Sequence, residues 1–191
     1  SDCRKLVASI DPLIALNMQL EFFFMEESAK INALDPSVSK ENFGSLCKID
    51  FVGLNHVLEH IGQNPDIFNN IIKELYRICK NNSIVDIRVP HPRHDDFISD
   101  PTHVRPITIL GLQLYDKSMN EKWEKMKAAN TPLALIHGVN FTIKDINFVL
   151  EKKYIKLLEN KEIDQNELQE YIRKYNNVVK EMKIKWVALK D

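Results

Sequence analysis

Ionisable side chains are concentrated in residues 91–105, a segment that contains three His, three Asp and two Arg. A His side chain titrates near neutral pH, so it can take a proton from an oxygen or nitrogen nucleophile. We therefore expect His91 or His94 to be a general base, with Asp95 as its orienting partner. His103 is a further catalytic candidate, or a residue that fixes the loop.

A second group, His56, Glu59 and His60, has the spacing H-x-x-E-H, which is the motif of inverted zinc peptidases. Such a peptidase needs both His on one face of a stable helix, with the Glu as general base. A Gly and a Pro follow shortly after, so little more than one helical turn fits here. We therefore expect Glu59 and His60 to cap and orient a turn, and no metal ligand is assigned. A divalent metal held by His and Asp of residues 91–103 stays open as an alternative.

Glycine is scarce in this chain of 191 residues. There are five, where average usage would give about thirteen. They are spread so widely that neither a G-x-G-x-x-G loop nor a Walker loop can be written. Any nucleotide-like ligand must therefore be held in another way.

The charge balance also excludes several classes of partner. The chain has 26 Lys and Arg against 27 Asp and Glu, a net charge of -1. A nucleic-acid or anionic-membrane binder would need clustered positive charge, so we expect neither partner. The longest apolar stretch, residues 13–25, is too short to span a bilayer and is interrupted by polar residues. Three Cys without a C-x-x-C pair fit a reducing compartment, so we expect a cytoplasmic protein. We also expect a monomer or a homodimer.

The elements that position these groups are clearest in the middle of the chain. Residues 49–54 and 83–89 are short runs typical of buried strands, and a helical pattern begins at Asn64-Pro65 between them and ends at Asn81-Asn82. A strand, a helix and a strand joined closely predict parallel strands in an α/β sheet. Because ligands bind beyond the carboxyl ends of such strands, residues 55–60 and 90–105 should share one edge.

The remaining elements complete a single domain over residues 1–191. Residues 90–144 are rich in Pro and predict loops and short helices, which could form a lid or a substrate pocket. Outside this segment we expect one further helix and several strands, the last of them half-exposed or at an edge. The strands are at residues 5–11, 31–34, 146–150 and 181–189, and the helix is at 164–175.

Several of these motifs resemble one known family. Asn55-His56-Val57-Leu58-Glu59-His60-Ile61, Glu74-Leu75-Tyr76-Arg77-Ile78-Cys79-Lys80 and the strand at 84–89 are similar to the second half of class I S-adenosylmethionine-dependent methyltransferases. The segments Val89–Asp96 and Asp100–Arg105 resemble a "VPH…DPTHVR" loop of bacterial members. The resemblance is strongest over residues 49–110. It implies a Rossmann-like fold, with a mostly parallel sheet and an antiparallel last strand.

The resemblance also implies an activity and a set of binding residues. It implies transfer of a methyl group from S-adenosylmethionine to the oxygen or nitrogen of a small-molecule or glycan-type acceptor. Asp35 would bind the cofactor's ribose, and Asn55 and His56 would lie beside its methionine part. The family places a D-x-G-x-G-x-G loop between Asp11 and Asp35, where this chain has no glycine. A methyltransferase-like protein with impaired cofactor binding and a metal-dependent hydrolase using residues 91–103 are the alternatives.

Overall fold

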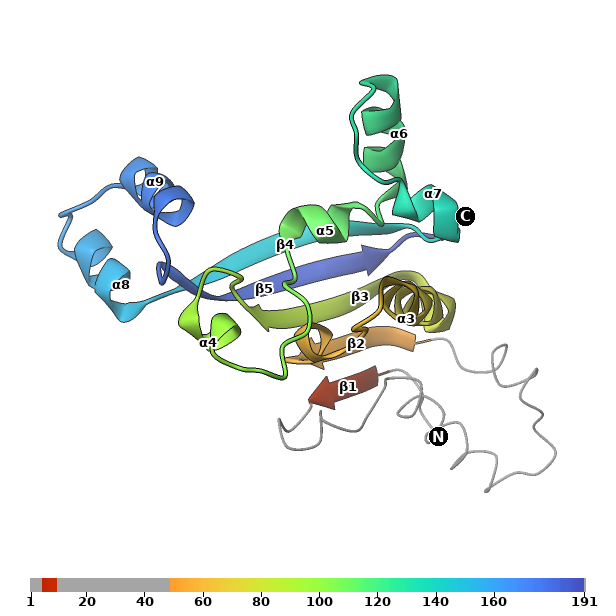
Figure 1. Cartoon of the computed structure of the whole chain (residues 1–191), viewed down its shortest axis with the longest axis horizontal. Helices are drawn as coiled ribbons and strands as arrows, with labels where there is room; N and C mark the ends of the chain where they lie inside the picture. Colours follow the sequence, from red (N-terminus) through yellow and green to blue (C-terminus); the bar gives the residue numbers. More distant parts are fainter. Residues whose placement is uncertain (1–4, 10–48, 191) are drawn as a thin grey trace.

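The structure is a computed structural model, and it describes residues 5–9 and 49–190. In these residues the strands form one sheet in the order β1-β2-β3-β5-β4 (Figure 1). β1, β2 and β3 are parallel, and β5 is antiparallel to both of its neighbours, β3 and β4. The expected α/β, Rossmann-like class with an antiparallel last strand is therefore confirmed. The strands are β1 (Lys5–Ser9), β2 (Ile49–Asn55), β3 (Cys79–Pro90), β4 (Phe141–Leu150) and β5 (Val179–Ala188).

The described helices are mostly short, and four of them lie between β3 and β4. That segment was predicted to hold loops and short helices, and it does. The helices are η1 (Leu58–His60), a 3-10 turn, and α3 (Pro65–Ile78), α4 (Asp95–Ile98), α5 (Ile109–Gln113), α6 (Lys117–Lys125), α7 (Leu133–His137), α8 (Lys152–Glu159) and α9 (Gln165–Lys174). Among the described residues no helix has the length and apolar character needed to cross a membrane.

The crossover helix α3 begins where the sequence predicts. The Asn64 side chain accepts a hydrogen bond of 2.8 Å from the Asp66 backbone N–H, and Pro65 occupies the first helical position. Its buried face consists of Phe68, Ile71, Ile72 and Leu75. This apolar face packs on the sheet and holds β2 and β3 side by side in parallel.

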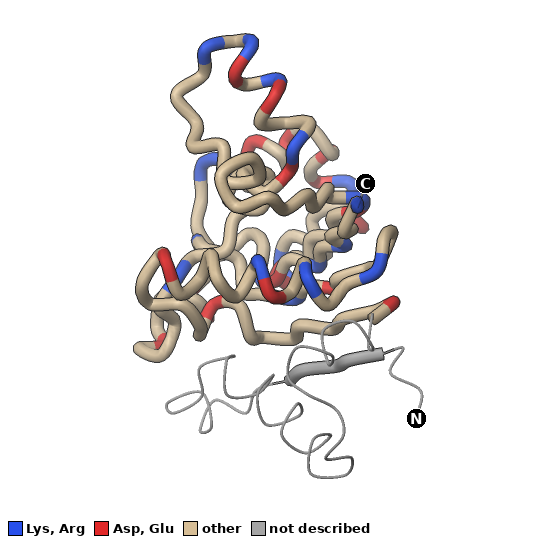
Figure 2. The backbone as a smooth tube through the Cα atoms, turned by 90° about the vertical axis from the view of Figure 1, so that its right-hand side faces the viewer, with Lys and Arg blue, Asp and Glu red and all other residues tan. Residues whose placement is uncertain are grey.

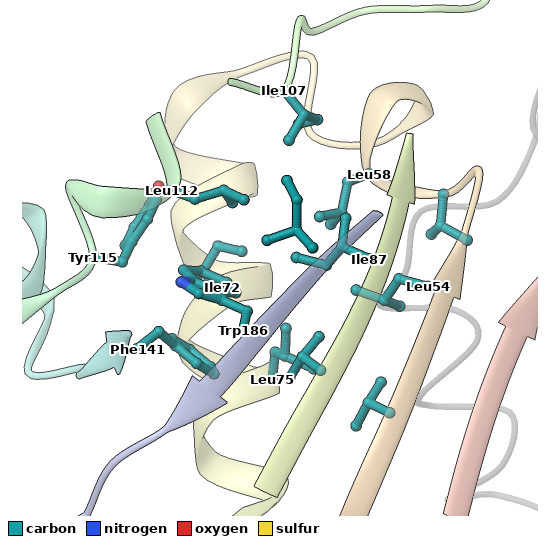
Figure 3. Packing of buried hydrophobic residues seen from close by; sticks show 14 of the residues in the cluster. Leu54, Leu58, Ile72, Leu75, Ile87, Ile107, Leu112, Tyr115, Phe141 and Trp186 are labelled. Carbon is teal, nitrogen blue, oxygen red and sulfur yellow. The ribbon is translucent and has the colours of Figure 1, made fainter. Parts of the chain in front are cut away.

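The core lies between α3 and the sheet, and α5 closes one side of it (Figure 3). Leu54 of β2, Ile87 of β3 and Trp186 of β5 face α3 and are almost fully buried. The Trp186 ring stacks on Phe141 of β4 with centroids 4.1 Å apart. Large buried aromatic side chains of this kind contribute strongly to core stability.

The end of α3 differs from the sequence prediction. The helix stops at Ile78, not at Asn81-Asn82, and β3 begins at Cys79. Asn82 adopts a left-handed φ of 63°, which Asn tolerates better than most residues. The pairing with β2 moves from Ile49 opposite Cys79 to Phe51 opposite Ile84. The backbone becomes extended directly at the helix C-cap, Cys79. Asn81 and Asn82 therefore lie inside β3, where its pairing with β2 is irregular.

The predicted positions of the last two strands also need correction. β4 begins at Phe141, earlier than the predicted start at residue 146. β5 pairs on both sides, so it is not an edge strand, although its alternation of buried and exposed residues is as expected. Alternation reports that one face of a strand is covered and says nothing about the number of neighbouring strands.

Lys, Arg, Asp and Glu are interspersed over the described backbone (Figure 2). This distribution agrees with the balanced composition of the chain. The absence of a nucleic-acid partner and the single-domain organisation both stay predictions.

Substitution of Gly62, which lies between η1 and α3, tests how closely the turn at η1 packs on α3. The φ of Gly62 is +69°, and a Cβ built there would lie 2.6 Å from the Phe68 Cβ. Gly138 has a similar φ of +64° but nothing within 4 Å. We expect Gly138→Ala to cost about 1–2 kcal/mol for the left-handed backbone alone, and Gly62→Ala to cost about 1–3 kcal/mol more. Urea unfolding of both variants measures the difference, and equal midpoints would contradict the packing described.

Candidate active site

A hollow of about 330 Å³ opens at the carboxyl ends of β2 and β3. In a Rossmann-like sheet this edge is where ligands bind. The predicted shared edge is therefore present. It includes residues from the turn after β2, from the segment after β3 and from β5. The lining residues are His56, His60, Pro90, Asp96, Asp100, His103, Lys180 and Glu181.

Backbone geometry brings these segments together. His56 follows the end of β2 with a left-handed φ of 51°, and its backbone N–H donates to the Arg88 carbonyl of β3 at 2.9 Å. The antiparallel register places Glu181 opposite Pro90, the last residue of β3. The last strand thus delivers a carboxylate to the same edge as the turn after β2.

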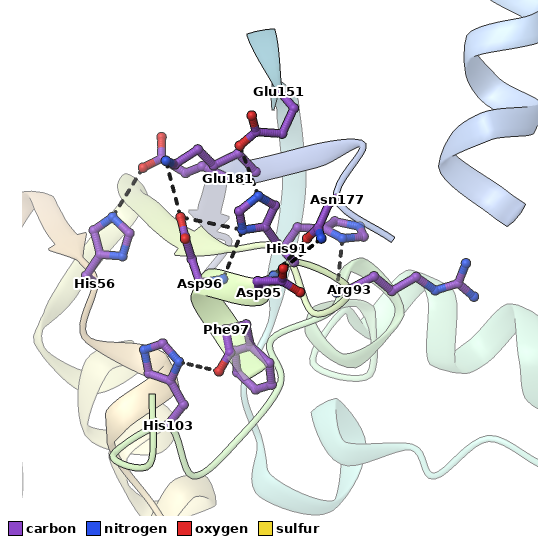
Figure 4. Close-up of polar contacts among 12 residues, drawn as sticks. His56, His91, Arg93, Asp95, Asp96, Phe97, His103, Glu151, Asn177 and Glu181 are labelled. Atoms are coloured by element: carbon purple, nitrogen blue, oxygen red, sulfur yellow. Dashed lines mark hydrogen bonds and ion pairs between the residues drawn. The ribbon is translucent and has the colours of Figure 1, made fainter. Parts of the chain in front are cut away.

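His56 bridges two carboxylates. Its Nδ1 lies 3.1 Å from Glu59 Oε1. Its Nε2 lies 3.2 Å from Glu181 Oε2, a contact that Figure 4 shows. The hydrogen bond to Glu59 is the largest cause of a raised His56 pKa. The charge of Glu59 and the contact with Glu181 also raise it, and burial opposes them. The contact with His56 gives the Glu181 carboxylate a fixed position at the hollow.

Asp100, Thr102 and His60 form a chain of hydrogen bonds. The Thr102 hydroxyl and backbone N–H donate to Asp100 Oδ1 at 2.6 and 2.8 Å. These bonds lower the pKa of the Asp100 carboxyl. Because a hydroxyl has a single proton, Thr102 Oγ1 must accept from His60 Nδ1, which lies 3.0 Å away. His60 Nδ1 therefore bears a proton, and in the tautomer with this single proton Nε2 has a lone pair.

His103 is fixed in a similar way. Its Nδ1 donates to the Phe97 carbonyl at 2.8 Å, and its ring stacks on the Phe97 ring at 5.1 Å. The Nε2 atom lies 3.7 Å from Asp100 Oδ2. His103 is the one member of the predicted catalytic group that lines the hollow.

The other predicted catalytic residues tie the β3–α4 turn to neighbouring segments. His94 is 5% exposed, and its Nδ1 accepts from the Asp96 backbone N–H at 3.0 Å, which caps α4. The His94 Nε2 lies 3.0 Å from Glu151 Oε1. The Asp95 side chain accepts a hydrogen bond of 2.9 Å from Asn177. These contacts fix the β3–α4 turn, and neither His94 nor Asp95 lines the hollow.

His91 also lies outside the lining of the hollow. Its Nδ1 accepts from the Arg93 backbone N–H at 3.2 Å. Burial is the largest cause of a lowered His91 pKa, followed by the neighbouring Arg93 and His94, so the ring is neutral near pH 7. The neutral His91 ring has one N–H. Because its Nδ1 accepts a hydrogen bond, this N–H is at Nε2.

The predicted cofactor residues fall in two groups. Asn55 is the last residue of β2 and lies opposite Ser9, the last residue of β1. His56 follows Asn55 and lines the hollow. Asp35 lies outside the described residues. The cofactor-binding roles of all three stay predictions.

Sequence reasoning missed two groups at the hollow, Lys180 and Glu181. Lys180 Nζ lies 3.3 Å from Asp96 Oδ2, so a cation from β5 meets a carboxylate from α4. Glu181 is the first residue of the strand predicted at 181–189, which is expected to be antiparallel, and Lys180 directly precedes it. An antiparallel strand begins at the edge of the sheet where the neighbouring strands end. The expected direction of the last strand could therefore have indicated that its first residues lie at the hollow.

Comparison with known proteins gives distant likenesses. No protein-family model and no curated protein matches the chain. Among solved structures, a SAM-dependent methyltransferase from Archaeoglobus fulgidus matches 76% of this chain and 63% of its own at 14% identity and a TM-score of 0.44. The YcgJ protein from Bacillus subtilis matches over 75% and 65% at 10% identity and a TM-score of 0.36.

A third solved structure is phosphoethanolamine N-methyltransferase 2 of Haemonchus contortus in complex with S-adenosyl-L-methionine. It matches over 74% of this chain and 34% of its own, at 16% identity and a TM-score of 0.35. The present chain thus spans less than two thirds of each of these three chains. The chain resembles class I methyltransferases, and the assignment of its fold rests on its own strand order and directions.

Proposed function

We propose that the protein transfers the methyl group of S-adenosylmethionine to an oxygen or nitrogen atom of a small-molecule or glycan-type acceptor. The observation that supports this best is the hollow at the carboxyl edge of β2 and β3, bordered by carboxylates and imidazoles. Methyl transfer needs an acceptor held in line with the methyl group and a group that receives the acceptor's proton. The hollow offers space for an acceptor and polar side chains that could receive its proton.

We assign one part of the cofactor to the ends of β1 and β2. Ser9 and Asn55 lie side by side at the carboxyl edge, and His56 connects this edge to the hollow. In the proposal Asn55 and His56 hold the methionine part, and Asp35 accepts hydrogen bonds from the ribose hydroxyls. When bound, S-adenosylmethionine supplies an electrophilic methyl group on a sulfonium.

The hollow is lined by three carboxylates, from Asp96, Asp100 and Glu181. Ionised carboxylates accept hydrogen bonds from hydroxyl or ammonium groups, which suits a polyhydroxylated or amine acceptor. Asp96 and Asp100 already have close partners in Lys180 and Thr102. Glu181 is held by His56 and has its other oxygen 3.7 Å from Lys183 Nζ. In the proposal Glu181 would receive the proton of the acceptor atom, and the bound cofactor would supply the methyl group.

Binding of S-adenosylhomocysteine tests the cofactor assignment. We expect calorimetric titration of the wild-type chain to show one site with a dissociation constant below about 1 mM, equivalent to about −4 kcal/mol. Asp35→Asn should weaken binding at least about tenfold, because the ribose loses a charged acceptor.

Asp50→Asn is the matched control for Asp35→Asn. Asp50 lies at the opposite, amino end of β2, where it is exposed and bonded to Lys80 at 2.8 Å. Binding should therefore be unchanged in this variant. Absence of binding by the wild type at millimolar ligand would contradict the cofactor assignment and favour a protein with impaired cofactor binding.

The role of Glu181 is tested with methyl-labelled S-adenosylmethionine and a panel of sugars, polyols and amines. Glu181→Gln keeps the side-chain shape and an acceptor for His56 but removes the base. We expect it to lower the rate of label transfer about 100-fold or more, with S-adenosylhomocysteine affinity kept within about twofold. Glu74→Gln, an exposed change on α3, is the control for the same chemical substitution.

His91→Gln provides the competing arm of this experiment. If His91→Gln abolishes transfer while Glu181→Gln does not, the proton goes to His91 and the assignment to Glu181 is wrong. A parallel loss of transfer and of cofactor affinity in Glu181→Gln would also contradict it, because the residue would then act through the structure.

A further inference from the structure

Glu59 has an unusual environment for a carboxylate. Its side chain is 0% exposed, and only Oε1 is bonded, to His56. The other oxygen, Oε2, is buried and has no hydrogen-bond partner among the described residues. A buried carboxylate oxygen without a partner is costly, so a group that binds it would be stabilising.

Two imidazoles converge on this carboxylate. One ligand atom each from Glu59, His60 and His103 lies within 4.8 Å of the other two. The two rings are 4.6 Å apart between centroids. The backbone holds this arrangement, because the Glu59 carbonyl accepts from the N–H groups of Val104 and Arg105 at 2.8 and 3.3 Å. The loop that contains His103 is thus tied to the turn that contains Glu59 and His60.

The hydrogen bonds of both His leave the same ring nitrogen available. His60 Nδ1 donates to the Thr102 hydroxyl, and His103 Nδ1 donates to the Phe97 carbonyl. A ring oriented through one N–H in this way presents the lone pair of its Nε2, which is how proteins prepare His as a metal ligand. Nε2 of His60 has no hydrogen bond within the described part of the chain, and Nε2 of His103 has only a carboxylate at 3.7 Å.

We propose that Glu59, His60 and His103 bind a divalent transition-metal ion such as Zn²⁺ or Fe²⁺. Two imidazoles and one carboxylate are a ligand set that these metals commonly take. The ligand atoms, which lie within 4.8 Å of one another, must move closer together to reach metal distances of about 2.0–2.2 Å. Asp100, whose Oδ2 lies 3.7 Å from His103 Nε2, adds negative charge beside the site.

The site uses the H-x-x-E-H letters differently from an inverted zinc peptidase. There both His bind the metal and the Glu is a base, whereas here both ring nitrogens of His56 are paired with carboxylates and Glu59 is a ligand. His60 and His103 line the hollow, so a coordination position left open by three protein ligands faces it. An exchangeable oxygen ligand, from water or from a hydroxylated acceptor, would complete the coordination. Metal binding by these residues does not depend on methyl transfer.

Metal titration of the full chain tests the proposal. The protein is freed of metal with a chelator and titrated with Zn²⁺ against a chromophoric competitor, and separately with Co²⁺, whose visible absorption reports coordination. We expect one equivalent of each ion to bind and the Tm to rise on addition of Zn²⁺. His60→Gln and His103→Gln should each weaken Zn²⁺ binding by at least about 100-fold and change the Co²⁺ spectrum.

His137→Gln at the end of α7 is the control, because it removes a His that is not part of the cluster. Glu59→Gln is made as well, but the two His variants carry the test because they do not alter the buried carboxylate. Circular dichroism verifies the fold of each variant. No stoichiometric binding by the wild type, or unchanged affinity in both His variants, would overturn the proposal.

S-adenosylhomocysteine affinity separates this proposal from the proposed function. We expect His103→Gln to lose the metal and keep the nucleoside ligand. If the wild type binds metal but does not bind S-adenosylhomocysteine, only the proposed function is contradicted. If it binds S-adenosylhomocysteine but does not bind metal, only the metal site is contradicted.

Discussion

The packing of α3 against the sheet is the interaction on which the rest of the structure depends. The helix connects β2 to β3, and burial of its apolar face forces the two strands to run in the same direction. Their carboxyl ends consequently meet at one edge. β5 enters beside β3 from the opposite direction, so that Glu181 lies opposite Pro90 at this same edge. The hollow is a product of these two pairings.

The polar groups at this edge support one another over long distances in the sequence. His56 connects Glu59, three residues away, with Glu181, 125 residues away. Thr102 similarly connects Asp100 with His60, 42 residues away. A site built from such contacts is oriented before any ligand arrives, which reduces the entropy lost on binding. It also concentrates carboxylates and imidazoles at one edge of the sheet.

The sequence predicts the local features of the fold well. The β2–α3–β3 unit and the cap at Asn64 follow from short-range patterns, and the structure confirms them. Pairing across the chain is less accessible. The position of Glu181 depends on a strand register, and the contact between His94 and Glu151 joins residues 57 apart. Side-chain type alone therefore indicated a reactive segment at 91–105 but could not say which of its His face the hollow.

An experimental structure with S-adenosylhomocysteine bound tests the central claim most directly. The claim is that the carboxyl edge of β1, β2 and β3 is a methyl-transfer site. The predicted result is a ligand whose methionine part lies beside Asn55 and whose sulfur faces the hollow lined by His56 and Glu181. A ligand bound at another edge of the sheet, or a sulfur that faces away from the hollow, would contradict the claim.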